Sequence, residues 1–126
     1  MKKWVLAVAA VGEVVTGVAL VVVPWVVIKL LFGADIAGIG VVTSQFAGLA
    51  LIALGVACWP RGSALNALSG MLTYSSLATV GLLYLAVGGK WNGPLLWPAI
   101  VLHAALTLLL TWAWLKPHED GPVTRT

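Results

Sequence analysis

Residues 4–23 read WVLAVAAVGEVVTGVALVVV, an apolar run interrupted by one acidic side chain, Glu13. A helix of about 20 apolar residues spans the hydrocarbon core of a bilayer, which is about 30 Å thick. This run continues to residue 32, and three more apolar stretches follow it. The four predicted spans are residues 4–32, 39–59, 64–87 and 94–115. The pattern predicts an all-α integral membrane protein.

The composition points the same way. Hydrophobic residues make up 61% of the chain and charged residues only 9%, which lies outside the range of soluble globular domains. The four spans use nearly the whole length of 126 residues, so we expect a single transmembrane domain, 1–126. A short polar C-terminal tail, 116–126, completes it.

The basic start at Lys2 and Lys3 also suggests a cleaved signal peptide, with residues 7–9 as the cleavage site. Only about four apolar residues precede that site, whereas a signal core needs roughly 7 to 15. We therefore expect the first helix to be retained.

Short, turn-rich links at residues 33–38, 60–63 and 88–93 favour antiparallel neighbours and predict an up-down-up-down four-helix bundle. Basic residues in short loops are retained on the cytoplasmic side. One side of the predicted bundle carries Lys2, Lys3, Arg61, Lys116 and Arg125, and the other carries Lys29 and Lys90. This bias predicts cytoplasmic termini in a bacterial inner membrane. It also accounts for the net charge of +3 without nucleic acid as a partner.

Aromatic and proline residues refine the limits of the spans. All seven tryptophans fall near predicted interfaces, where an amphipathic ring is favoured. Pro24 removes a helical hydrogen bond, so it predicts a kink in the first span. Residues 25–32 would then either end that helix or bend along the outer interface.

Small residues mark where helices can approach closely, because packing rather than the hydrophobic effect drives helix association in lipid. The predicted packing positions are Gly12, Gly17, Ser44, Gly48, Gly70 and Gly81. Beyond membrane lipids, we expect the partners to be other membrane protein subunits or a second copy of the chain.

Glu13 and His103 are the clearest functional lead, because ionisable groups inside a membrane are costly and normally face a protein interior. At about 1.5 Å of rise per residue, Glu13, Tyr74 and His103 lie about 13, 15 and 18 Å from the cytoplasmic helix ends. They therefore occupy one layer, and helices 1 and 4 are predicted neighbours. The candidate site comprises Glu13, His103, Tyr74, Thr107 and Thr16.

Three interpretations of this site remain open. The pair can be a structural lock, a proton carrier, or a site for a lipophilic ligand or cofactor such as a quinone or haem. Serine and threonine side chains near it form either a polar thread or hydrogen bonds to carbonyls of their own helices, and the second reading is favoured. No metal site is expected from one His and one Glu, and no motif of an enzyme is present.

Two resemblances add expectations. The four spans, the early Glu13-x-x-x-Gly17 and the glycine-rich second span resemble small bacterial membrane proteins of the broad DoxX-like kind. That likeness implies a four-helix bundle associated with respiratory or redox membranes. In the fourth span, Ala99-x-x-x-His103 is similar to the helix of bacterial light-harvesting polypeptides. This resemblance implies that His103 ligates bacteriochlorophyll and that the small side chain of Ala99 leaves space for the pigment ring.

The leading interpretation is a non-enzymatic accessory or assembly subunit in which Glu13 and His103 form a buried polar lock. A small proton-coupled transporter or channel is the alternative from another class, and haem, quinone or bacteriochlorophyll binding through His103 is a third. The sequence does not indicate a particular cofactor.

Overall fold

The computed structural model describes residues 2–61 and 64–116. Its secondary structure there is all helical, with the elements α1 (Lys2–Val22), α2 (Pro24–Phe32), α3 (Ile39–Ala57), α4 (Ala64–Val87) and α5 (Leu96–Leu115). The all-α prediction is confirmed. The predicted polar tail lies outside the described residues except for Lys116.

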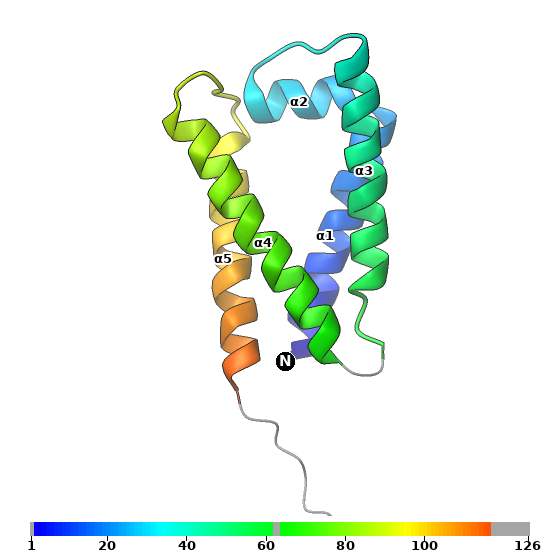
Figure 1. The fold of residues 1–126 in the computed structure, drawn as a ribbon, viewed down its shortest axis with the longest axis vertical. Coiled ribbons are helices and arrows are strands. Elements are labelled where there is room, and N and C mark those ends of the chain that lie inside the picture. Colours follow the sequence, from blue (N-terminus) through cyan, green and yellow to red (C-terminus); the bar gives the residue numbers. More distant parts are fainter. Residues whose placement is uncertain (1, 62–63, 117–126) are drawn as a thin grey trace, which may run out of the picture.

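The predicted span 4–32 is two helices rather than one. Pro24 has no N–H to continue the ladder, so α1 ends at Val22 and Pro24 occupies the first turn of α2. Helix α2 lies across the top of the molecule in Figure 1, roughly crosswise to the long helices. It ends at Gly33, whose φ of 72° is the left-handed conformation that glycine adopts readily.

The long helices form two pairs. Helices α1 and α3 pack along each other, as do α4 and α5, and the two pairs meet mainly through contacts of α1 with α4 and α5. In Figure 1 the pairs converge near the N-terminus and separate toward α2. A core of apolar residues fills the end where they converge: Leu6, Ala9, Ala10, Cys58, Leu68, Met71, Leu110 and Ala113.

Helix α2 joins the two pairs at the other end. The Asn92 N–H donates to the Phe32 carbonyl at 3.1 Å, and the Leu95 N–H donates to the Leu30 carbonyl at 2.8 Å. These bonds satisfy carbonyls at the C-terminal end of α2 that have no partner within their own helix. A Cβ atom on Gly93 would collide with backbone atoms of Leu30 and Leu31, so this α4–α5 link packs directly against α2.

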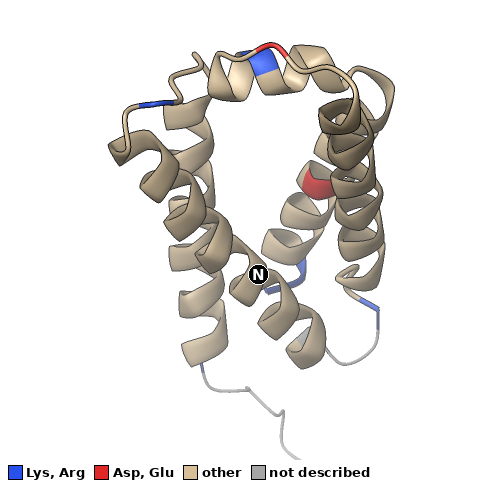
Figure 2. Cartoon of the chain, turned by 45° about the horizontal axis from the view of Figure 1, so that its top comes forward, with Lys and Arg blue, Asp and Glu red and all other residues tan. Residues whose placement is uncertain are grey.

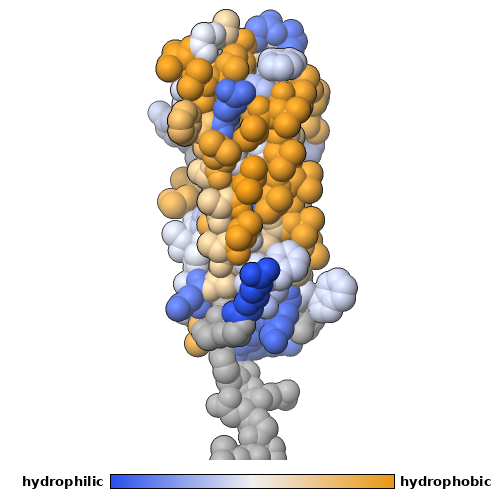
Figure 3. All heavy atoms as spheres, turned by 90° about the vertical axis from the view of Figure 1, so that its right-hand side faces the viewer, coloured by the Kyte–Doolittle hydropathy of each residue, from blue (hydrophilic) through white to orange (hydrophobic). Residues whose placement is uncertain are grey.

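In the described part of the chain, four helices, α1, α3, α4 and α5, are long and apolar enough to cross a membrane. The charged residues of the described chain lie at the two ends of the assembly, with Glu13 as the exception (Figure 2). The face in Figure 3 is largely apolar between ends that carry more hydrophilic residues. Many large apolar side chains are exposed, Val15, Phe46, Leu77 and Leu108 among them. Such a surface suits contact with lipid or with other membrane helices.

Candidate functional site

Glu13 lies in the middle of α1 and is almost completely buried, with 5% of its surface exposed. Its Oε1 is 3.9 Å from Nε2 of His103 on α5. That separation allows strong electrostatic interaction but exceeds the usual hydrogen-bond length of about 2.7–3.2 Å. The structure thus brings together the two ionisable residues on which the sequence analysis centred. A proton held by either residue leaves the pair without net charge.

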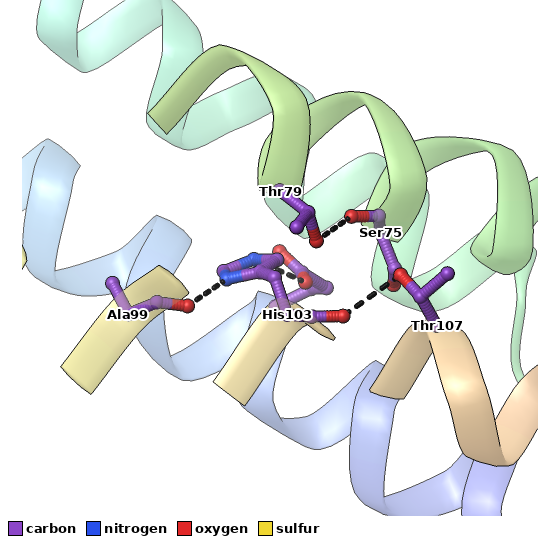
Figure 4. A network of polar contacts seen from close by, with 6 residues as sticks. Ser75, Thr79, Ala99, His103 and Thr107 are labelled. Carbon is purple, nitrogen blue, oxygen red and sulfur yellow. Dashed lines mark hydrogen bonds and ion pairs between the residues drawn. The ribbon is translucent and has the colours of Figure 1, made fainter. Parts of the chain in front are cut away.

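A second contact fixes the imidazole ring of His103. Its Nδ1 lies 2.8 Å from the carbonyl oxygen of Ala99, one turn earlier in α5 (Figure 4). A carbonyl only accepts hydrogen bonds, so Nδ1 carries the proton in this contact. In the neutral ring, Nε2 is therefore an acceptor. The His103 side chain is 16% exposed, so the surrounding helices do not enclose it completely.

Tyr74 on α4 is the third member of the predicted layer. Its ring meets the His103 ring edge to face, with centroids 6.0 Å apart and planes at 66°. Residues from α1, α4 and α5 thus meet where the two helix pairs begin to separate.

Among the described residues, neither of the other two predicted site residues hydrogen-bonds to the Glu13 carboxyl or to the His103 imidazole. Thr107 donates its hydroxyl to the carbonyl of His103 at 2.8 Å, within α5. Thr16 is exposed on α1 and lines a cavity one turn beyond Glu13. Most of the nearby hydroxyls likewise donate to carbonyls of their own helices, as the sequence analysis favoured: Thr43, Ser44, Ser76, Thr79 and Thr111.

The predicted packing positions separate into two groups. Gly17 and Gly48 face each other across α1 and α3, and a Cβ on either would lie 2.5 Å from the carbonyl oxygen of the other. Gly70 is near Cys58, whose Sγ would be 3.4 Å from an added Cβ, and Ser44 lines the cavity. A Cβ on Gly12 or Gly81 would meet no atom of the described residues within 4 Å, so neither glycine lies at a close helix contact within this chain, and their role in packing stays a prediction.

Three structurally important residues lie outside the predicted site and the predicted packing positions. Gly55 continues the α1–α3 contact, since its Cβ would lie 2.6 Å from the Ala10 carbonyl oxygen. Gln45 donates from Nε2 to the Val21 carbonyl at 3.1 Å, next to the break at Pro24. The Ser75 hydroxyl is fully buried and has no hydrogen-bond partner among the described residues. The spacing of Gly48 and Gly55, two helical turns apart, was a signal for the first of these.

Beyond the Glu13–His103 pair, a cavity of about 910 Å³ lies between the helix pairs. Its lining comes from all five helices and is mainly aliphatic and aromatic, with α2 at the outer end. His103 and Tyr74 line it as well, at the level of the pair. The site therefore combines a polar contact with an adjoining apolar space.

Possible metal ligands are sparse. The described residues contain no group of three or more His, Cys, Asp or Glu side chains that could hold a metal ion. Because Nδ1 of His103 is bonded to the Ala99 carbonyl, only Nε2 could ligate a haem or bacteriochlorophyll metal. Glu13 Oε1 lies 3.9 Å from this nitrogen. The geometry offers such a metal one histidine nitrogen with a carboxyl group beside it.

Comparison with protein-family models, with curated proteins and with solved structures finds no match to this chain. Its function is therefore inferred from the geometry of the Glu13–His103 pair and the cavity beside it.

Proposed function

We propose that the chain is a non-enzymatic integral membrane protein, an accessory or assembly subunit of a larger membrane complex, in which Glu13 and His103 fasten two helical hairpins together. The hairpins are α1 with α3 and α4 with α5, arranged as an up-down-up-down bundle. The observation that carries this proposal is the 3.9 Å contact between α1 and α5 at the depth where the hairpins begin to separate. Electrostatic attraction is strong in a medium of low dielectric constant, so this contact can hold the hairpins in register.

Orientation is part of the proposal. Lys2, Lys3, Arg61 and Lys116 lie at the end of the assembly that carries the N-terminus, whereas Lys29 and Lys90 lie at the other end. By the positive-inside rule, this excess of basic residues at one end supports an orientation with cytoplasmic termini in a bacterial inner membrane. Lys29 is paired with Asp35 at 2.7 Å, which further reduces the positive charge of the outer end.

A subunit role is supported by the apolar surface. Gly12 on α1 has open space around it, so another helix can approach it closely. Exposed valine side chains flank this position: Val8, Val11 and Val15. Other membrane proteins or a second copy of the chain would pack there.

Proton transport through the same pair is the second candidate, favoured by the placement of an acid beside an imidazole. It has less support because most of the hydroxyls needed for a polar thread donate to carbonyls within their own helices. The route from the pair toward the outer end also passes through the largely apolar cavity.

Glu13→Gln separates these functions. A structural lock should lose thermal stability and yield of the assembled complex in mild detergent, because the amide keeps the shape but not the charge of the carboxylate. A proton carrier should stay folded and lose pH-dependent proton flux in liposomes. Thr111→Val is the matched control, since it removes only a hydrogen bond within α5. A stable, assembled Glu13→Gln variant would contradict the lock. Purification of the wild-type chain alone would contradict the subunit role.

A further inference from the structure

The cavity between the hairpins has the size and lining of a ligand site. Its volume of about 910 Å³ lies near the upper end of the range of roughly 300–1,000 Å³ that small-molecule pockets occupy. Leu20, Leu31, Phe32, Leu82 and Leu102 supply much of an apolar wall. His103 and Tyr74 supply polar groups at one level of it. Such an arrangement suits an elongated molecule with one polar end.

The charge of the site defines what that polar end can be. None of the described residues that line the cavity is Lys, Arg, Asp or Glu. The nearest carboxyl group, on Glu13, lies 3.9 Å from His103 Nε2 and is not among the residues that line the cavity. An ionised head group would lose its hydration there without an opposite charge to replace it, at high cost. The cavity therefore suits a neutral polar end.

The His103 imidazole determines whether a ligand in the cavity would donate or accept a hydrogen bond. When the proton of the pair is held by Glu13, the imidazole is neutral, and because its Nδ1 donates to the Ala99 carbonyl, its Nε2 is an acceptor. Glu13 Oε1, 3.9 Å away, is too distant to hydrogen-bond with it directly. A hydroxyl group of a ligand can donate to this nitrogen, whereas an ether or a ketone cannot.

The bilayer gives such a molecule a way in. Helices α3 and α4 contact each other little in the described part of the chain, although both line the cavity. At the outer end, α2 is held by backbone hydrogen bonds of Phe32 and Leu30 to the α4–α5 link. Entry between α3 and α4 thus needs no opening of α2.

We propose that this cavity binds a neutral membrane-soluble alcohol or phenol, with its hydroxyl donating to His103 Nε2 and its apolar body lying between the hairpins beneath α2. The site goes beyond the proposed subunit role and does not require it. It shares His103 with the proposed lock, so the test must separate loss of binding from loss of folding.

Photolabelling in phosphatidylcholine nanodiscs tests the assignment. The probes are a diazirine-bearing hexadecanol and its methyl ether, which has the same body but no hydroxyl to donate. We expect the alcohol to label residues of the cavity about threefold to tenfold more than the ether, the effect of one hydrogen bond. Equal labelling by both probes, or labelling spread over the lipid-facing surface, would overturn the proposal.

Two variants localise the effect. His103→Phe should abolish the preference for the alcohol, and Ala78→Leu, which fills part of the cavity without touching the pair, should reduce labelling by both probes. Ala50→Leu, at an exposed position outside the cavity lining, is the control for added bulk. Undiminished labelling of Ala78→Leu would overturn the site.

Thermal stability of each variant is measured in the same nanodiscs. A His103→Phe protein that is as stable as wild type contradicts the lock, while its labelling still decides the ligand site. If His103→Phe does not fold, Ala78→Leu and the alcohol–ether comparison on the wild-type protein decide it.

Discussion

The contact between α1 and α3 and the contact between α1 and α5 differ in how the helices approach each other. Along α1–α3, glycines bring two backbones together so closely that an added methyl group would collide with a carbonyl oxygen. Between α1 and α5, the helices meet near the core and at Glu13–His103, and beyond that level a cavity separates the pairs. The first contact depends on close backbone packing, whereas the second includes a polar pair. The polar groups and the space for a ligand therefore lie where packing is incomplete.

Gly17→Leu should produce the largest effect, because the side chain must displace the α3 backbone at Gly48. We expect a loss of about 3 kcal/mol or more in the free energy of unfolding, the upper end of the cost of overpacking. Titration with sodium dodecyl sulfate in mixed micelles measures it. Gly12→Leu, on the same helix with open space around it, is the control. Equal stability of the two variants would mean that α1 and α3 do not pack as described.

Gly93→Ala tests the junction between α2 and the second hairpin. Its methyl group would collide with the backbone of Leu30 and Leu31, so we expect a loss of about 2 kcal/mol and faster hydrogen exchange at Asn92 and Leu95. Gly88→Ala, where the added Cβ meets the Tyr84 carbonyl at an ordinary 3.4 Å, should change little. Unchanged exchange in Gly93→Ala would show that α2 is not anchored to this link.

Gln45→Leu should have the smallest effect of the three. It leaves the Val21 carbonyl beside the Pro24 break without its side-chain donor, and we expect a loss of about 1 kcal/mol. Thr43→Val, which removes a hydrogen bond within α3 only, is the matched control. Thermal unfolding in one detergent compares the two. If both variants lose equally little stability, the hydrogen bond from Gln45 on α3 to the Val21 carbonyl on α1 does not stabilise the helix break at Pro24.

Much of the helical layout could be predicted from the sequence, because apolar length and turn residues are local signals. The spans after residue 38 begin and end close to the observed helices, and the break at Pro24 follows from its missing N–H. The common depth of Glu13 and His103 also follows from helical rise alone.

The angle between the hairpins could not be predicted. Helices that are apolar on all sides, such as α5, give no periodic signal for which face is buried. The close contact at Gly55, the bond from Gln45 and the open surroundings of Gly12 and Gly81 all depend on helix rotation. The cavity depends on how far the pairs separate, which the bonds between α2 and the α4–α5 link help to set.

A double-mutant cycle on Glu13→Leu and His103→Leu tests most directly whether the hairpins are fastened by this pair. Each single variant leaves the other polar group buried without its partner, whereas the double variant leaves neither. Unfolding free energies in mixed micelles should therefore show a coupling of about 1–2 kcal/mol, with the double variant less destabilised than the sum of the singles. Strictly additive losses of unfolding free energy would contradict the proposal that Glu13 and His103 fasten the hairpins together.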